Sequence, residues 1–229
     1  MQIFRRIVRK IVRDARKYIR LRRARKIGLA YVEPNFVYWP RIKPGDTVVD
    51  AGCSYEADFS VLMIERHGAK SFAVDPTRKH HPSLAALEAR YGDKFIHLPI
   101  AIGPSNGELI FHESETHESG SLMDDHTNVI SDKIVSYTVR SVTLPKLVEQ
   151  LEADKIAILK LDIEGAEYPL LLDVKASDLA PFDQIFIEFH HHAVSNFGIN
   201  DTRRVVDRIT KIGFQSFSLD EHNYLFWRK

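Results

Sequence analysis

Hydrophobic and polar positions follow two patterns along most of this chain. From Pro40 onward, short apolar runs recur between glycine, proline and charged residues, which is typical of buried strands. Segments with apolar residues three or four positions apart lie between these runs and predict amphipathic helices. The predicted strands are TVVD, KSFAVD, KFIHLPIAIG, LIFHES, IVSYTVRS, KIAILKLDI, FDQIFIEFH and a terminal antiparallel pair in FQSFSLDEHNYLFWRK.

The predicted helices carry ordinary start and stop signals. ADFSVLMIERHGA ends near Gly68, HPSLAALEARYG has Pro82 in its first turn and Gly92 after it, and TRRVVDRITKIG ends at Gly213. TLPKLVEQLEA and EYPLLLDV are two further helices, and Asn106-Gly107 marks a hairpin-like turn. Strands that alternate with helices predict an α/β fold with a mostly parallel, doubly wound sheet and an antiparallel C-terminal strand.

The N-terminal segment has a different pattern. Residues 1–26 hold twelve Lys/Arg and one acid, so they carry +11 in a chain whose net charge is +1. We expect a basic amphipathic helix over residues 1–28, followed by one domain over residues 29–229. Its apolar stripe consists of Ile3, Phe4, Ile7, Val8, Ile11, Val12, Ala15, Tyr18 and Ile19.

Such a helix is typical of peripheral contact with an anionic membrane surface. The alternatives are packing on the body, oligomerisation through the helix, and nucleic-acid binding, which is the least favoured. The single cysteine, Cys53, excludes an internal disulfide framework and fits a reducing compartment. There is no secretory signal pattern and no apolar run of roughly 18 residues. We therefore expect a cytoplasmic protein, peripheral to the inner membrane surface through residues 1–26.

The first candidate chemistry lies in VVDAGCS. A strand that ends in Asp50 and passes through Gly52 into a helix brings a ligand close to bare backbone and free N–H groups. The next strand ends at Asp75, where an acid can bind ribose hydroxyls. These features predict an adenosine-bearing cofactor at the carboxyl ends of the strands. The competing interpretation of Asp50 and Gly52 is a helix cap and a tight turn.

The second candidate lies in ILKLDIEGAEYPLL and FIEFHHH. Asp162, Glu164 and Glu188 follow two buried strands and are expected at the same rim, and His190 follows Glu188. These four residues could position and deprotonate an acceptor hydroxyl, or they could ligate a divalent cation, which the sequence does not establish. The competing interpretation is that Glu164 and Glu167 complement a helix dipole and that the histidines form a polar loop.

These segments resemble the FkbM-type methyltransferases. VRSVTLPKLVEQLEADKIAILKLDIEGAEYPLLLDV and FDQIFIEFH match the family's hallmark, and VVDAGCS, FAVDP and LPIAIGPSNGELIFH match its other motifs. The resemblance covers roughly residues 40–228. The turn DAGCSYEAD lacks the second glycine of the family's "DVGAN-x-G" and holds one extra residue, and Pro145 replaces the acid of its "TLD".

The resemblance implies a class I, Rossmann-like methyltransferase that binds S-adenosylmethionine. Gly52 and its neighbours, including Ser54, would hold the methionine end, Asp75 the ribose, and Ala101 with Ile102 the adenine, while the stretch that ends at Ser121 would approach the cofactor. Asp162 or His190 would act as the base on a hydroxyl, expected on a sugar or glycan, including a lipid-linked one.

Three alternatives remain open at this stage. A nicotinamide-dependent oxidoreductase would share the sheet, and a metal-dependent hydrolase would use the acids and histidines. A non-catalytic binding module would keep the fold without turnover.

Overall fold

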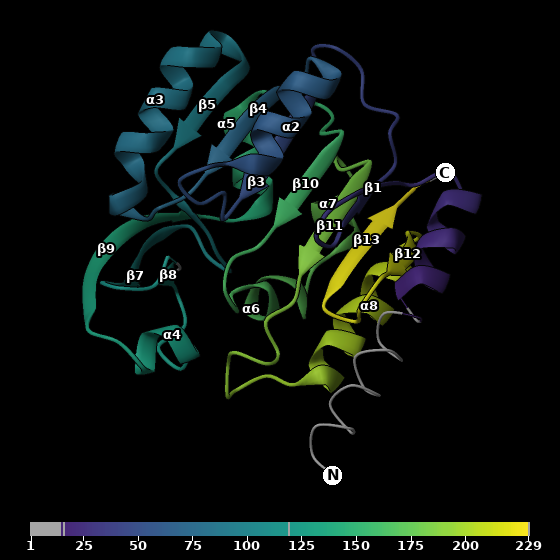
Figure 1. Cartoon of the computed structure of the whole chain (residues 1–229). Helices are drawn as coiled ribbons and strands as arrows, with labels where there is room; N and C mark the ends of the chain where they lie inside the picture. The colour runs from purple at the N-terminus through teal and green to yellow at the C-terminus, as the bar shows by residue number, and fades with distance from the viewer. Residues whose placement is uncertain (1–14, 16, 119, 229) are drawn as a thin grey trace.

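The computed structural model describes residues 15, 17–118 and 120–228. A seven-stranded sheet forms its centre (Figure 1). Its strands, in spatial order, are β12 (Gln215–Ser218), β13 (Asn223–Trp227), β11 (Gln184–Glu188), β10 (Ile158–Leu161), β3 (Thr47–Ala51), β4 (Lys70–Val74) and β5 (Phe95–Leu98). Strand β13 is antiparallel to both of its neighbours, and the other pairings are parallel. The predicted sheet is confirmed.

The central strands are apolar on both faces because helices cover both faces. Val48 and Val49 are both fully buried, yet they belong to different apolar clusters on opposite sides of the sheet. One side is covered by α2 (Asp58–His67), α3 (His81–Tyr91) and the hairpin of β1 (Ala30–Val32) and β2 (Phe36–Tyr38). The other is covered by α5 (Leu144–Leu151), α6 (Glu167–Leu171), α7 (Ala176–Leu179) and α8 (Ile199–Lys211).

A second, four-stranded sheet lies beside the carboxyl ends of the central strands (Figure 1). It contains β6 (Ala101–Ile102), β9 (Ile134–Val142), β7 (Gly107–Ser114) and β8 (Gly120–Ser121), and α4 (Thr127–Ile130) connects β8 to β9. The prediction of a single strand through KFIHLPIAIG is wrong. The chain leaves the central sheet after β5 and joins the second sheet at β6, because Pro99 between them has no N–H to donate to a ladder.

The helix over residues 17–26 packs on the body of the protein. Ala24 is fully buried, Leu21 packs on the same apolar cluster, and the Arg20 guanidinium donates to the Leu219 carbonyl at 2.8 Å. Tyr18 and Ile19, the end of the predicted apolar stripe, are 61% and 66% exposed. The face that packs is therefore not the predicted stripe, most of which falls outside the described residues. Within the described ranges, no helix is both long enough and apolar enough to span a bilayer.

Candidate active site

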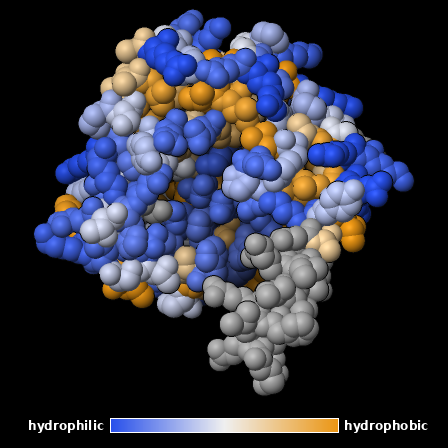
Figure 2. All heavy atoms as spheres, viewed as in Figure 1, coloured by the Kyte–Doolittle hydropathy of each residue, from blue (hydrophilic) through white to orange (hydrophobic). Residues whose placement is uncertain are grey.

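A pocket lies at the carboxyl ends of β3, β4 and β10, beneath the second sheet. The surface over this end of the sheet is mostly hydrophilic (Figure 2). Seven of the residues predicted from the sequence line the pocket: Gly52, Ser54, Asp75, Ala101, Ile102, Asp162 and Glu164. Ile100, Phe111 and Leu122 add an apolar wall from the second sheet and the segments around it. A polar rim and an apolar wall suit a ligand with hydroxyl groups and a flat ring.

A glycine is required at position 52 because another segment of the backbone passes very close to it. Its φ is +73°, and a Cβ at this position would lie 1.7 Å from the Asp162 carbonyl oxygen. The turn after β3 and the turn after β10 are therefore in direct contact, and both line the pocket. The sequence-based explanation, close approach of a ligand to bare backbone, omitted this contact.

Asp75 is almost fully buried at the end of β4, and both of its carboxylate oxygens accept hydrogen bonds. The Thr77 N–H donates to Oδ1 at 2.8 Å, the Ser54 N–H donates to Oδ2 at 3.0 Å, and His80 Nδ1 lies 3.1 Å from Oδ2. Burial raises the pKa of Asp75, but the hydrogen bonds and charge of His80 and the hydrogen bonds from Thr77 outweigh it, so the pKa is below its usual value. The carboxylate is thus held ionised and fixed in direction.

Asp50 is fully buried on the α2 side of the sheet and does not line the pocket. Residues alternate along a strand, so Asp50 faces the same way as Val48 while Ala51 faces the pocket side. Its Oδ2 accepts hydrogen bonds from the Ser60 N–H at 3.1 Å and the Ser60 hydroxyl at 2.8 Å. The competing interpretation, a helix cap, describes this contact, because the first N–H groups of α2 have no acceptor within the helix.

Lys160 compensates the buried charge of Asp50. Its Nζ lies 3.3 Å from Asp50 Oδ1 and 3.2 Å from Asp162 Oδ2. Burial alone lowers the pKa of Lys160, but the charges of Asp162 and Asp50 outweigh burial and raise this pKa above its ordinary value. Burial raises the pKa of Asp50, with Lys160 and Ser60 acting in the opposite direction. Lys160 therefore links the carboxylate of Asp50, on the α2 side of the sheet, to the carboxylate of Asp162 at the pocket rim.

Ser121 lies next to the pocket without lining it. Its side chain is fully buried, and its hydroxyl donates to the Glu164 carbonyl at 2.6 Å. Glu164 itself has a φ of +52°, which is unusual for a residue with a side chain. The contact from Ser121 therefore helps to hold the turn after β10 in place.

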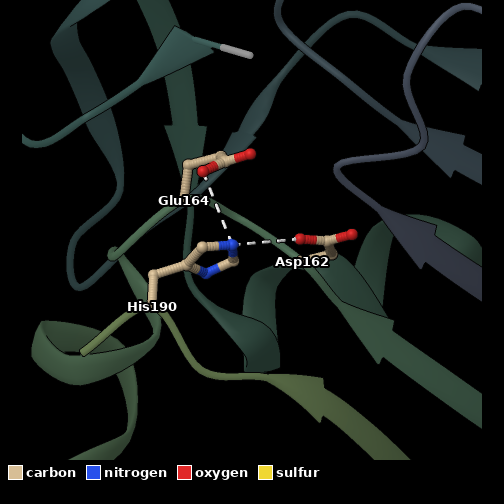
Figure 3. Close-up of side chains that lie close together, drawn as sticks. All are labelled: Asp162, Glu164 and His190. Atoms are coloured by element: carbon tan, nitrogen blue, oxygen red, sulfur yellow. Dashed lines mark ion pairs between the residues drawn. The ribbon is translucent and has the colours of Figure 1, made fainter. Parts of the chain in front are cut away.

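Asp162, Glu164 and His190 form a cluster at the rim (Figure 3). The His190 Nε2 atom lies 3.5 Å from Asp162 Oδ1 and 3.4 Å from Glu164 Oε2. Two of these residues follow β10 and the third follows β11, and the two strands are parallel neighbours. The cluster therefore contains three of the four residues that the sequence indicated as catalytic candidates.

Glu167 contacts His190 on the side of the ring that faces away from Asp162 and Glu164. The Glu167 side chain is fully buried, its Oε1 lies 3.1 Å from His190 Nδ1, and the N–H groups of Ile163 and Gly165 donate to Oε1 and Oε2 at 2.9 and 3.0 Å. Burial alone lowers the pKa of His190, but the charges of Glu167, Glu164 and Asp162 outweigh burial and raise the pKa to about 10. Glu167 therefore does more than complement a helix dipole.

Glu188 and His126 flank the cluster. Burial, and then the charge of Asp162, raise the pKa of Glu188 to about 7, and Glu188 does not line the pocket. His126 belongs to the loop before α4, and its Nε2 lies 2.8 Å from Glu164 Oε2. Its Nδ1 accepts a hydrogen bond from the Asn128 N–H at 3.2 Å, so Nε2 is the nitrogen that carries the proton in a neutral ring.

The FkbM methyltransferase domain matches the sequence over residues 46–216, which is most of the chain. The chain belongs to the FkbM methyltransferase family. Its fold is that of the class I, S-adenosylmethionine-dependent methyltransferases, as the resemblance implies. Membership of this family speaks against the hydrolase and oxidoreductase alternatives.

One solved structure supports the fold of this FkbM protein. A crystal structure of the methyltransferase FkbM from Methylobacillus flagellatus KT matches with a TM-score of 0.52 and 15% identity, over 82% of this chain. The match spans 44% of that longer chain. A putative rRNA methylase from Clostridium thermocellum matches at a TM-score of 0.47 and 9% identity, over 81% of this chain and 86% of that one. No curated protein matches the sequence significantly.

The turn after β3 lacks the family's second glycine, but two of its residues adopt a backbone conformation that is typical of glycine. Ala57, which precedes α2, adopts the left-handed conformation with φ +46° and ψ +44°, and its side chain is fully buried. Ser54 is also left-handed, with φ +58°. Residues with side chains thus take backbone conformations that glycine adopts without cost.

Four side chains at the site are not predicted from the sequence: Lys160, Glu167, His126 and His80. Lys160 is a single cation inside the apolar strand β10. A charged residue at such a position indicates a buried partner of opposite charge, and this is the sequence signal that could have identified Lys160. His80 is 3% exposed and lines the pocket, and its Nε2 has no hydrogen-bond partner within the described residues. His126 is far in sequence from Asp162, Glu164 and His190, so its position beside them has no sequence signal.

Proposed function

We propose that this FkbM protein transfers the methyl group of S-adenosylmethionine to a hydroxyl oxygen of a sugar or glycan. The observation that carries the proposal is that Asp162 lies on the rim of the pocket. Its side chain is 26% exposed, it lines the pocket, and its Oδ2 is held by Lys160. A carboxylate in this position can accept a hydrogen bond from an acceptor hydroxyl, and sugars present such hydroxyls at high density.

The chemistry requires few protein groups. The acceptor oxygen attacks the methyl carbon as the carbon–sulfur bond breaks, the bonding pair stays on sulfur as a neutral thioether, and the hydroxyl proton passes to Asp162. Rate then depends mainly on alignment of oxygen, carbon and sulfur, and on the base. Asp162 suits the base better than His190, because Asp162 lines the pocket and the Nδ1 of His190 faces Glu167.

In this proposal the nucleoside occupies the region of the pocket between Gly52, Asp75 and Ile102. Asp75 would accept hydrogen bonds from the ribose hydroxyls, and the apolar wall around Ile102 would contact the adenine. A divalent cation, if the reaction uses one, would take Asp162, Glu164 and His190 as its ligands.

The test is transfer of a radiolabelled methyl group from S-adenosylmethionine to a panel of free sugars, glycosides, nucleotide sugars and lipid-linked glycans. We expect label in a sugar product whose methyl is O-linked by mass spectrometry and NMR, and a strong loss of transfer in Asp162→Asn. The proposal fails if the protein binds the cofactor but labels only protein, nucleic acid or nitrogen acceptors.

The acceptor's location is a further part of the proposal: the N-terminal helix would hold the enzyme at an anionic membrane surface. Support comes from the exposed pair Tyr18 and Ile19, which lie beside arginines on a helix whose other side packs on the body. Full-length protein should co-sediment with vesicles that contain anionic lipids but not with neutral vesicles. A Tyr18→Ser/Ile19→Ser variant keeps Ala24 and Arg20 in place, so binding equal to wild type in this variant would contradict the proposal.

A further inference from the structure

The cluster at the rim has the composition and spacing of a metal centre. Asp162, Glu164 and His190 each present one ligand atom, and these atoms lie within 4.8 Å of one another. In Figure 3 the His190 Nε2 points into the gap between the two carboxylates. Its distances to them, 3.5 and 3.4 Å, exceed the usual 2.7–2.9 Å of a charge-assisted hydrogen bond.

Those distances fit the edges of a coordination polyhedron. Metal–ligand bonds of about 2.1 Å place adjacent ligand atoms about 3.0 Å apart in an octahedron and about 3.4 Å apart in a tetrahedron. Two carboxylates and one imidazole are ligands that first-row dications such as Mn²⁺ accept. The ligand atoms of Asp162 and Glu164 also lie within 4.8 Å of each other, so rotation of these side chains would let all three residues surround one ion.

The orientation of His190 is fixed by a buried carboxylate outside the cluster. Glu167 faces Nδ1 at 3.1 Å and is itself held by two backbone N–H groups, so Nδ1 is committed and Nε2 is aimed at Asp162 and Glu164. The His190 side chain is only 7% exposed. A carboxylate behind the second nitrogen is the arrangement that orients metal-binding histidines.

The charge at this centre favours a dication. Lys160 divides its single positive charge between Asp50 and Asp162. Glu164 and Glu167 add two further carboxylates around His190. The raised pKa of His190 adds one positive charge among these carboxylates, and an ion of charge +2 would take its place by displacing the Nε2 proton, because a metal binds only the unprotonated nitrogen.

We propose that Asp162, Glu164 and His190 bind a divalent first-row metal ion at the edge of the cofactor pocket. Because Asp162 and Glu164 also line the pocket, the ion would face the bound substrate. Three protein ligands leave coordination positions for acceptor oxygens, so the preferred acceptor is a sugar with two adjacent hydroxyls that chelate the ion. This choice of acceptor rests on the proposed function.

The ion changes the role of Asp162. A hydroxyl bound to a dication has a lowered pKa and binds as an alkoxide, with its proton lost to water. The alkoxide then attacks the methyl carbon, and the carbon–sulfur bonding pair leaves on sulfur. Asp162 holds the ion in this case and is no longer the proton acceptor. His126 does not join the ligands, since its Nδ1 accepts the Asn128 N–H and its Nε2 therefore carries the proton, 2.8 Å from Glu164 Oε2.

The test is direct Mn²⁺ binding to full-length protein, followed by electron paramagnetic resonance. We expect one Mn²⁺ per chain in wild type, and binding weakened at least about tenfold in Glu164→Gln and in Asp162→Asn. Glu118→Gln is the matched control, because Glu118 lines the same pocket but is not part of the cluster, and it should bind Mn²⁺ like wild type.

Two results would overturn the metal site: no Mn²⁺ bound by wild type, or equal binding by wild type, Glu164→Gln and Asp162→Asn. Calorimetric titration of the same samples with S-adenosylhomocysteine separates this failure from failure of the proposed function. Cofactor binding without Mn²⁺ binding removes the metal site alone, and Mn²⁺ binding without cofactor binding removes the methyltransferase proposal alone. If both bind, transfer to a sugar with adjacent hydroxyls should exceed transfer to its mono-deoxy analogue, and equal transfer would contradict chelation.

Discussion

Replacement of Gly52 by alanine tests the contact on which the pocket is built. The added Cβ would lie 1.7 Å from the Asp162 carbonyl oxygen and 2.7 Å from its carbonyl carbon. Neither backbone can move freely, because the Gly52 N–H donates to the Val74 carbonyl at 2.9 Å and the Asp162 N–H donates to the Ala51 carbonyl at 3.0 Å. The substitution must therefore distort the centre of the sheet.

Two costs combine in Gly52→Ala. A left-handed backbone costs a residue with a Cβ about 1–2 kcal/mol, and a forced shift of packed atoms costs about 1–3 kcal/mol more. We expect a total loss of about 2–5 kcal/mol in the free energy of unfolding, a large fraction of the roughly 5–15 kcal/mol of a typical domain. The clash also displaces Asp162, so methyl transfer should fall in the fraction that remains folded.

Gly45→Ala is the matched control. Gly45 has a φ of +83°, but apart from Gly45 and its two chain neighbours no atom of the described residues lies within 4 Å of the position that its Cβ would occupy. This variant should lose only the backbone cost of about 1–2 kcal/mol. Urea unfolding followed by tryptophan fluorescence measures both variants. If Gly52→Ala is no more destabilising than Gly45→Ala, the close approach to Asp162 does not exist in solution.

Three further predictions concern buried groups. Lys160→Met should lower the free energy of unfolding, measured in urea, by about 3–5 kcal/mol. The Asp50→Asn/Lys160→Met double variant should recover part of this loss. A loss below about 1 kcal/mol in Lys160→Met would contradict the buried pairing of Lys160 with Asp50. Ala57→Gly should lower the melting temperature less than Ala73→Gly, which changes a buried strand position, because only Ala57 has a left-handed backbone that glycine adopts more easily. An equal or larger loss of melting temperature in Ala57→Gly would refute this. His80→Phe should weaken S-adenosylhomocysteine binding in calorimetry by at least about tenfold, because His80 lines the pocket and contacts Asp75, which would bind the ribose. Unchanged affinity would contradict both contributions of His80 to cofactor binding.

The sequence predicted the sheet and the rim well because both depend on local patterns. Apolar runs with acids at their ends indicate where parallel strands end, and that placed Asp75, Asp162 and Glu164 at one edge. The direction of Asp50 could not be obtained in the same way. Acids that end neighbouring strands can face either side of a sheet, and which side depends on the residue's place in the strand's alternation.

The residues that were missed act over long distances in the chain. Glu167 contacts His190 through the pairing of β10 with β11, and its burial reverses the expectation that it only complements a helix dipole. Lys160 is paired with Asp50 by strand register, since the two residues are directly opposite in β10 and β3. The third example, His126, reaches Glu164 from a separate loop. Such contacts depend on tertiary structure, which periodicity and spacing do not report.

A co-crystal structure of the full-length protein with S-adenosylhomocysteine tests the central claim most directly. We expect a nucleoside between Gly52 and Ile102, with its ribose hydroxyls within hydrogen-bond distance of Asp75 and its sulfur facing Asp162. An empty pocket at saturating ligand, or the nucleoside bound elsewhere on the molecule, would contradict it.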